Sequence, residues 1–174
     1  IQAAISAAND GDAVRIFPYF TGTTFPVAYI ENFDASTALD TLGKAILVTS
    51  SDPNVYPLVL AASSTQRVLT ARSGEGPDTV ISCLQLQGGN GGVRIDGSSP
   101  TLFHNQIHNN QASGSGGGIL VLNASNPAIL GNEIFTNQAT SGGGIAIIGA
   151  GAAPTLEGNL SLIHISEPTR RTII

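Results

Sequence analysis

The stretch Pro100-Thr-Leu-Phe-His-Asn-Gln-Ile-His-Asn-Asn-Gln-Ala112 recurs as Pro127-Ala-Ile-Leu-Gly-Asn-Glu-Ile-Phe-Thr-Asn-Gln-Ala139, and a third copy opens as Pro154-Thr-Leu-Glu-Gly-Asn159. Each copy begins with proline and has asparagine at its sixth position. The same step thus separates Pro100 from Pro127 and Pro127 from Pro154. A fixed step of this length is typical of a solenoid, in which every repeat forms one turn that stacks on the next.

Each repeat contains three short segments that are suited to strands. Glycine runs lead into the aliphatic segments 119–122 and 145–148, the proline leads into 128–130, and the asparagine leads into 133–136. Because successive side chains of a strand face opposite sides, every second residue of these segments is expected to point into a core. The predicted inward residues are Ile119, Val121, Ile129 and Ile134, with Val93, Ile95, Leu102 and Ile107 one coil earlier.

Coils stacked about 4.8 Å apart would bury these aliphatic side chains in columns and pair each backbone with its neighbours. The sequence therefore predicts an all-β fold, a right-handed single-stranded parallel β-helix over residues 1–160, with regular coils over 93–159. At the start, Ile1, Ala4, Ile5 and Ala8 would share one face of a helix. We expect a short helix within residues 1–10 to cap the unpaired edges of the first coil.

The recurring asparagines are predicted to be structural. At a bend, asparagine tolerates the left-handed backbone conformation, and its amide can bond to the same amide one coil away. We therefore expect Asn105, Asn132 and Asn159 to form a ladder, and we assign them no ligand.

Composition excludes some classes of partner. Only 11% of the residues are charged, the formal net charge is −5, and the seven Lys and Arg are scattered along the chain. Because nucleic acids and anionic membranes select clustered cations, we expect neither as a partner. No apolar run approaches the length of a membrane span. The single cysteine, Cys83, cannot form an internal disulfide, and we expect it to be a structural thiol.

Several stretches resemble one group of proteins. Residues 1–8 followed by 11–14, the stretch 43–50 and the later Ser-Pro-Thr-Leu repeats are similar to bacterial right-handed β-helix repeat proteins of the pectin-lyase-like superfamily. Residues 135–139 with 142–145 also resemble paired motifs of autotransporter passenger domains. The resemblance covers about residues 1–160. It implies the fold and leaves the activity open, because the superfamily includes lyases, hydrolases, epimerases and non-catalytic surface proteins.

The last residues depart from the repeat. Position 161 is serine, where the repeat requires an inward isoleucine as at Ile107 and Ile134. The stretch from Ser161 to Arg171 resembles a translated sequencing-library adapter. We therefore expect residues 161–174 to be a non-native or unstructured tail on a fragment of a longer β-helix, and we draw no function from His164.

The resemblance implies what catalytic residues would look like. Lyases of this superfamily use acidic residues that hold Ca²⁺ together with an Arg or Lys base, and hydrolases use clustered carboxylates. The candidates here are Arg94 and Asp96 on one strand, with His104 and His108 on the next strands of that coil. None of the four recurs in the next coil. We expect Arg94 and Asp96 to form an exposed salt bridge and both histidines to be solvated surface groups.

The leading hypothesis is therefore an extracellular or cell-surface β-helix module that binds carbohydrate or a surface partner, without a visible catalytic centre, metal site or cofactor. The alternative is the N-terminal part of a polysaccharide lyase or glycoside hydrolase, and Ca²⁺ is expected only in that case. Self-association is also expected, through the unpaired edges of the last coil.

Overall fold

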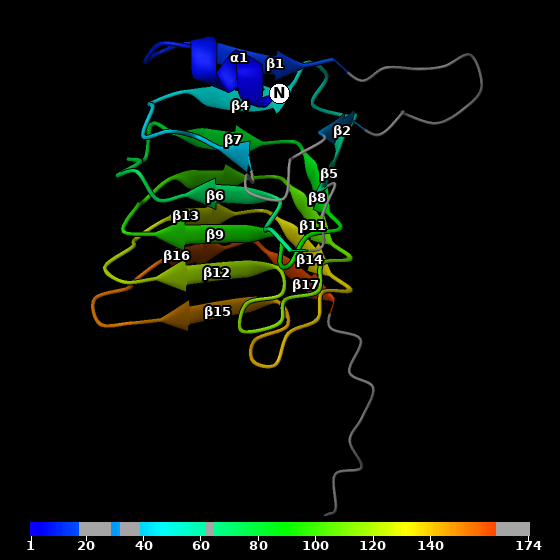
Figure 1. The fold of residues 1–174 in the computed structure, drawn as a ribbon, viewed down its shortest axis with the longest axis vertical. Coiled ribbons are helices and arrows are strands. Elements are labelled where there is room, and N and C mark those ends of the chain that lie inside the picture. The colour runs from blue at the N-terminus through cyan, green and yellow to red at the C-terminus, as the bar shows by residue number, and fades with distance from the viewer. Residues whose placement is uncertain (18–28, 32–38, 62–64, 163–174) are drawn as a thin grey trace, which may run out of the picture.

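The computed structural model describes residues 1–17, 29–31, 39–61 and 65–162. Within them the chain winds as a right-handed parallel β-helix, because every third strand pairs in parallel with its counterpart in the next coil. Figure 1 shows the coils stacked along the long axis, from the N-terminal helix at one end to the strand β17 at the other. The predicted fold class is confirmed.

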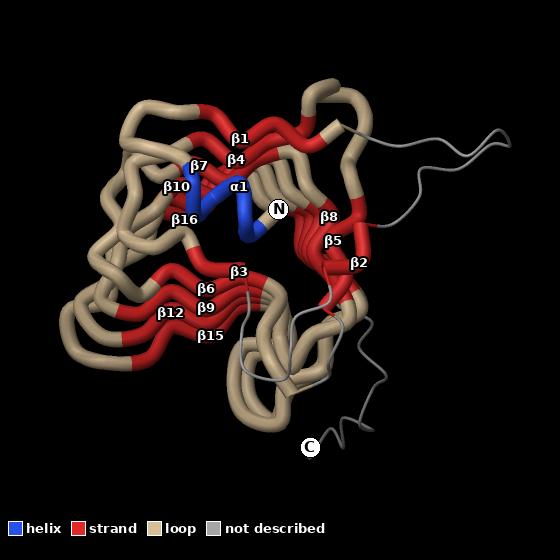
Figure 2. Tube along the Cα trace, turned by 45° about the horizontal axis from the view of Figure 1, so that its top comes forward, coloured by secondary structure: helices blue, strands red, loops and turns tan. Residues whose placement is uncertain are grey.

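Three parallel sheets form the walls of the solenoid. The first sheet contains β1 (Ala13–Ile16), β4 (Leu47–Ser50), β7 (Val80–Ser82), β10 (Thr101–Phe103), β13 (Ala128–Leu130) and β16 (Thr155–Glu157). The second sheet contains β2 (Tyr29–Glu31), β5 (Leu58–Ala61), β8 (Gln85–Gln87), β11 (Gln106–His108), β14 (Glu133–Phe135) and β17 (Leu160–Leu162). The third sheet contains β3 (Leu39–Asp40), β6 (Leu69–Ala71), β9 (Val93–Asp96), β12 (Ile119–Leu122) and β15 (Ile145–Ile148). Figure 2 looks into the solenoid and shows the sheets on three sides, with turns closing the fourth.

Aliphatic columns fill the interior, as the alternation predicts. In the third sheet Val93 lies opposite Ile119, and in the second Ile107 lies opposite Ile134. All eight predicted inward side chains are buried, and none exposes more than 1% of its surface. The parallel pairing therefore stacks like residues on like.

The repeat is less uniform than the prolines suggest. In the first sheet Thr101 pairs with Ala128, which is the same step as from Pro100 to Pro127. In the third sheet Val93 pairs with Ile119 and Ile119 with Ile145, so each step there is one residue shorter. The turn from β14 to β15 is accordingly one residue shorter than the turn from β11 to β12. The turn from β15 to β16 is one residue longer than the turn from β12 to β13.

The sequence predicts the left-handed backbone conformation at the recurring asparagines. In the structure the residue before each asparagine adopts it instead. His104 has φ 53°, Gly131 has φ 62° and Gly158 has φ 64°. Cys83, with φ 55°, occupies the same place one coil earlier. The asparagine side chains that follow instead turn inward under the bend, where Asn105 and Asn132 are buried.

Hydrogen bonds run along this line of asparagines. Asn105 Nδ2 donates to Asn132 Oδ1 at 3.0 Å, and Asn132 Nδ2 donates to Asn159 Oδ1 at 3.1 Å. One coil before Asn105 the place is taken by Leu84, whose backbone N–H donates to Asn105 Oδ1. A second line, which the sequence interpretation missed, joins Asn110 Nδ2 to Asn137 Oδ1 at 3.0 Å. The same amides also bond backbone groups that the bends would otherwise leave unpaired, such as the Asn105 N–H and the Leu102 carbonyl at Asn132.

The helix α1 (Gln2–Ala7) closes the first coil. The Gln2 side chain makes the two hydrogen bonds to Asp40 on β3 that a neighbouring strand would make. Its Oε1 accepts the Asp40 N–H, and its Nε2 donates to the Asp40 carbonyl. Ile5 is fully buried against the interior. Lys44 Nζ donates to the carbonyls of Ile5, Ser6 and Ala8, which places a cation at the C-terminal end of the helix.

The far end of the solenoid extends past the expected boundary at residue 160. The strand β17 continues to Leu162, and Ser161 lies opposite Ile134 in the register of the repeat. Residues 163–174, including His164, lie outside the described residues. Large apolar side chains are exposed on the last coils: Ile147, Ile148, Leu156 and Leu160.

Candidate functional site

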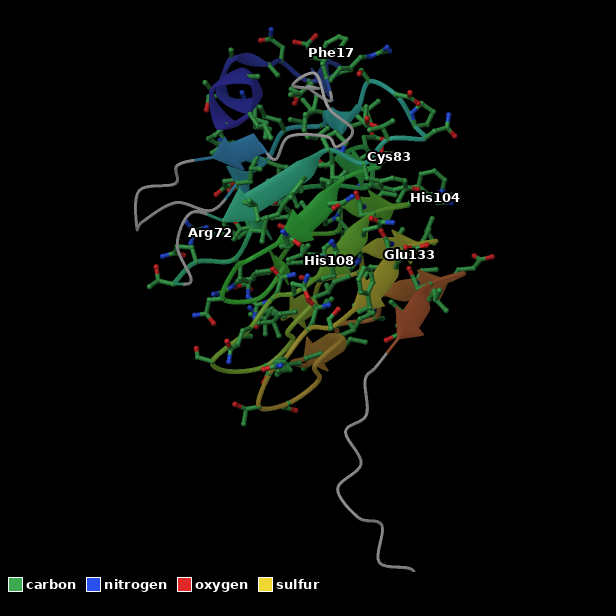
Figure 3. All side chains as sticks on the ribbon, turned by 90° about the vertical axis from the view of Figure 1, so that its right-hand side faces the viewer. Phe17, Arg72, Cys83, His104, His108 and Glu133 are labelled. Atoms are coloured by element: carbon green, nitrogen blue, oxygen red, sulfur yellow. The ribbon has the colours of Figure 1, made fainter. Side chains whose placement is uncertain are left out.

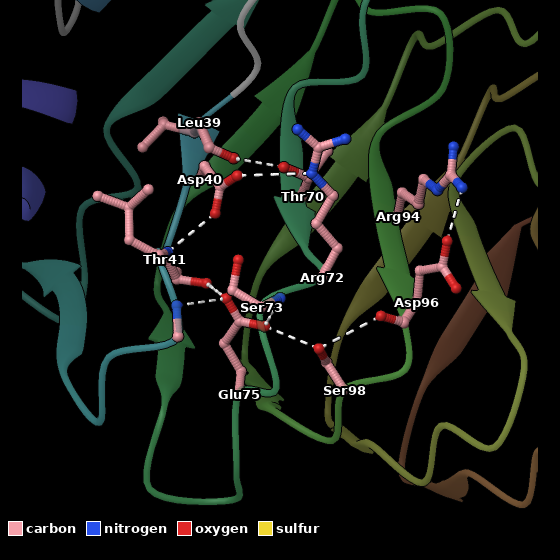
Figure 4. Close-up of polar contacts among 12 residues, drawn as sticks. Leu39, Asp40, Thr41, Thr70, Arg72, Ser73, Glu75, Arg94, Asp96 and Ser98 are labelled. Atoms are coloured by element: carbon pink, nitrogen blue, oxygen red, sulfur yellow. Dashed lines mark hydrogen bonds and ion pairs between the residues drawn. The ribbon is translucent and has the colours of Figure 1, made fainter.

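A hollow of about 310 Å³ lies on the outer face of the third sheet. Arg67, Arg72 and Arg94 line it together with polar groups that include Thr70 and Asn90. These are three of the seven basic residues of the chain. Arg94 is the one predicted candidate that contributes to this lining, and its strand neighbour Asp96 lies beside it (Figure 4).

Arg94 and Asp96 form an ion pair, with Arg94 Nη2 at 2.6 Å from Asp96 Oδ2. The side chains are 42% and 20% exposed, so the pair is less solvated than the sequence suggested. Asn123 Nδ2 also donates to Asp96. The hydrogen bond from Arg94 holds the pKa of Asp96 below its usual range, although partial burial opposes this. Arg94 Nε is buried and has no hydrogen-bond partner within the described part of the chain.

Arg72 follows strand β6 and lies next to Asp40. Its Nε is 3.7 Å from Asp40 Oδ2, and its side chain is 64% exposed. This separation is too long for a hydrogen bond, so the pair is a loose electrostatic contact. Figure 4 shows Arg72 and Arg94 extending from neighbouring strands of the third sheet.

Arg67 is half-buried and joins three coils. Its Nη1 donates to the carbonyls of Val93 and Gly116, at 3.1 and 2.7 Å, and its Nη2 donates to the carbonyl of Ser115 at 2.7 Å. Burial and, secondarily, the nearby positive charge of Arg94 lower the pKa of Arg67 to about 10. The guanidinium therefore remains charged at neutral pH, and it fixes the loop that borders the hollow.

A second hollow of about 400 Å³ adjoins the first at the corner between the second and third sheets. Asn90 and Ser113 line both hollows, and Ser113 N–H donates to Asn90 Oδ1 at 2.8 Å. Gln111 and Asn109 contribute further polar side chains. Together the two hollows form a groove across neighbouring coils, which we call the corner groove.

A buried carboxylate supports the edge of the third sheet. Glu75 is 2% exposed and accepts four hydrogen bonds, from the hydroxyls of Thr41 and Ser98 and from the backbone N–H groups of Gly43 and Ser73. Burial alone would raise the pKa of Glu75, but these hydrogen bonds outweigh it and lower the pKa. The network in Figure 4 fixes the bends that follow strands β3, β6 and β9. Glu75 lies outside the lining of the corner groove and acts as a structural anchor.

Neither predicted histidine lines this groove, and both are labelled in Figure 3. His108 nevertheless borders it, because its Nδ1 is 3.0 Å from Nδ2 of the groove residue Asn109. His104 is exposed at its bend, and its ring contacts Phe103. His108 corrects the expectation of a solvated group, because it is only 9% exposed and stacks on Phe135 with 4.6 Å between ring centroids. Burial lowers the pKa of His108. The structure therefore does not bring the four candidates together in one site.

Cys83 is buried with a free thiol, in keeping with a structural place at its bend. Among the residues that the structure describes, no group of three or more His, Cys, Asp or Glu side chains is arranged to hold a metal ion. No helix within the described part of the chain has the length and apolar character needed to cross a membrane.

Comparison with known proteins agrees with this architecture. The family model for the right-handed β-helix region matches residues 68–161, more than half of the chain. The searches of curated proteins and of solved structures found no match. The matched segment begins just before β6 and contains the lining of the corner groove from Thr70 onward. With its stacked parallel coils and this match, the chain belongs to the right-handed β-helix family.

Proposed function

We propose that this chain is a binding module of an extracellular or cell-surface β-helix protein, of the bacterial pectin-lyase-like kind, and that it holds carbohydrate in the corner groove. The observation that carries the proposal is the groove itself, which joins two hollows over successive coils and has amide and hydroxyl side chains in its lining. Fold alone does not specify an activity, so the argument rests on the chemistry of this surface.

The groove offers groups that suit sugar hydroxyls. The amides of Asn90, Asn109 and Gln111 can both donate and accept hydrogen bonds, and the hydroxyl of Ser113 can do the same. These side chains come from turns of neighbouring coils, which repeat at about 4.8 Å. An extended chain molecule that crosses both coils could therefore meet polar groups from each of them.

The scaffold keeps these groups in place before a ligand arrives. The Asn110–Asn137 line lies beneath the turns that carry them, and Asn110 Oδ1 accepts the Gly89 N–H at 3.1 Å. Arg67 fixes the loop at Ser115 and Gly116. Because little ordering is left for the binding step, a groove of this kind can bind with a smaller entropy cost.

A panel of soluble oligosaccharides, neutral and acidic, titrated into the purified chain tests the proposal. We expect amide NMR shifts to change at Asn90, Gln111 and Ser113, and binding to weaken several-fold in Gln111→Ala. The matched control is Gln85→Ala, on the outer face of the second sheet. Absence of any shift change in the groove with every sugar would refute the proposal.

The alternative, a lyase or hydrolase, is tested with the same protein. Polyuronides are incubated with the chain with and without added Ca²⁺, and absorbance of unsaturated products is followed alongside the release of reducing ends. We expect neither product. Formation of either one, lost in Arg94→Gln, would replace the binding module with an enzyme.

A further inference from the structure

Positive charge is concentrated at one end of the corner groove. The chain carries 12 Asp and Glu against 7 Lys and Arg, yet Arg67, Arg72 and Arg94 line a single hollow. Two carboxylates, Asp40 and Asp96, pair with these arginines among the described residues. The hollow is thus a local positive site on a protein of net negative charge, and such a site attracts anions.

The three guanidiniums are compensated unequally. The hydrogen bonds of Arg67 described above all end on backbone carbonyls, those of Val93, Ser115 and Gly116. Carbonyls satisfy N–H donors but carry no net charge. Two carboxylates therefore face three cations, and one positive charge remains for a ligand to balance.

Donors for such a ligand are available. A guanidinium has five N–H groups in a fixed fork. Among the described residues, the Arg94 side chain makes one hydrogen bond, from Nη2 to Asp96. Arg72 holds Asp40 only at 3.7 Å and keeps most of its side chain in solvent. Arg72 can therefore turn toward an anion without breaking a hydrogen bond to Asp40, and Arg94 would give up at most its bond to Asp96.

We propose that this hollow is an oxyanion subsite, in which Arg72 and Arg94 donate hydrogen bonds from neighbouring coils to a carboxylate or a sulfate group. Arg67 lies beneath them as a fixed cation and positions the loop at Ser115 and Gly116. Guanidinium forks match the geometry of both groups, and charge-assisted bonds of this kind are the strong ones. As a subsite within the groove, it rests on the proposed function only for its sugar-borne form.

The first experiment uses simple anions, so that it does not depend on sugar binding. Sodium sulfate and sodium acetate are titrated into the chain at constant ionic strength, and the arginine Nε–Hε and nearby amide NMR signals are followed. We expect saturable shifts at Arg72, Arg94 and Thr70. Binding should weaken about tenfold in Arg72→Gln, which removes charge-assisted hydrogen bonds.

A second arginine variant and a control variant test this result. Arg94→Gln should also weaken binding about tenfold, but it frees Asp96, so its fold is checked by circular dichroism. Arg15→Gln is the matched control, because Arg15 is an exposed arginine on β1, outside the hollow. Equal sulfate binding in Arg72→Gln and wild type, or equal loss in Arg15→Gln, would overturn the oxyanion subsite.

The second experiment identifies the source of the anion. A uronic acid tetrasaccharide is compared with its carboxyl-reduced, neutral form. Tighter binding of the acidic sugar, lost in Arg72→Gln, supports a sugar-borne carboxylate. Sulfate binding without any sugar binding supports a free-anion subsite and refutes the proposed function. Equal binding of both sugars, unchanged in Arg72→Gln, keeps the carbohydrate groove and refutes the sugar-borne form of the subsite.

Discussion

Asn132 Oδ1 accepts two hydrogen bonds from Asn105, one from its side-chain Nδ2 at 3.0 Å and one from its backbone N–H at 2.9 Å. The Nδ2 of Asn132 in turn donates to the carbonyls of Leu102 and Leu130. One buried amide thus holds backbone groups of two coils. Its removal would leave several of them without a partner in the interior, where unpaired polar groups are costly.

Replacing Asn132 with alanine should therefore destabilise the fold strongly. We expect a loss of about 3 kcal/mol in the free energy of unfolding, measured by urea denaturation. Asn126→Ala is the matched control, because Asn126 is exposed and its Oδ1 accepts one bond, from the Ala153 N–H. A loss in Asn132→Ala no larger than in the control would contradict the role of the buried ladder.

Gly131 and Gly158 occupy the same left-handed bend but have different surroundings. A Cβ on Gly131 would lie 2.6 Å from Cδ2 of His104, whereas a Cβ on Gly158 would have its nearest neighbours at 3.8 Å. Gly158→Ala should cost only the left-handed backbone penalty, about 1 kcal/mol. Gly131→Ala should lower the free energy of unfolding by more than this. When His104→Ala is added to Gly131→Ala, the loss caused by the alanine at position 131 should fall to the value measured for Gly158→Ala. Both single variants are measured by urea denaturation. Equal losses in stability would contradict the prediction, because they would show that the His104 ring moves aside without cost.

We expect the bends that Glu75 holds, at the ends of strands β3, β6 and β9, to lose stability in acid. Its pKa is lowered in the folded state, so the unfolded chain binds the proton more tightly. The stabilisation is full above the unfolded carboxyl pKa of about 4.3 and is lost as the pH falls through the lower folded value. Glu75→Gln should be less stable by about 2 kcal/mol at pH 7 and should lose less stability on acidification.

Thermal unfolding midpoints measured from pH 7 to pH 3 check this expectation. Glu157→Gln serves as the control, since Glu157 is exposed on β16. Its pH profile should follow that of the wild type. Parallel profiles for Glu75→Gln and the wild type would mean that the buried carboxylate does not contribute to the pH dependence.

The last coil should be the least protected. β12 pairs on both sides, with β9 and β15, whereas β15 pairs only with β12 among the described strands. We expect the amides of Ile145–Ile148 to exchange with deuterium much faster than those of Ile119–Leu122 at low protein concentration. Equal protection in dilute protein would refute this.

We also expect the chain to self-associate through β15, the edge strand of the third sheet. Ile147 and Ile148 are each 45% exposed at the edge strand of the third sheet. Raising the protein concentration should slow exchange in β15 and increase the average mass in sedimentation equilibrium. Ile147→Lys should reduce both effects, because a charge on an open edge opposes pairing with another chain. Gln106→Lys is the matched control, because Gln106 lies on β11, an inner strand of the second sheet that pairs on both sides.

The repeat that begins at Pro100 was sufficient to predict the coils and their inward aliphatic residues, because like residues pair directly across coils. It misplaced the left-handed bend by one residue, since glycine and histidine share that position with no common pattern. The predicted match of Val93 with Ile119 already contained the shorter step of the third sheet, and the structure confirms this match. Compensating changes in two turns keep the step between the prolines unchanged.

The groove could be predicted only in part. Arg94 and Asp96 stood out because they lie two residues apart on one strand. Arg67 and Glu75 did not, because their partners are 23 to 49 residues away in the chain, apart from the Ser73 N–H that lies close to Glu75. Such contacts arise from winding, and no local pattern marks them.

Arg67 also bears on how the solenoid comes apart. In a molecule where each turn touches only the adjacent ones, turns can peel away singly from a free end. Arg67 precedes β6 but reaches past β9 to the loop before β12, so it spans a full intervening turn. Under a pulling force, the turns from β6 to β12 should rupture as one block and give a single large extension, whereas β15 to β17 should unravel in small steps.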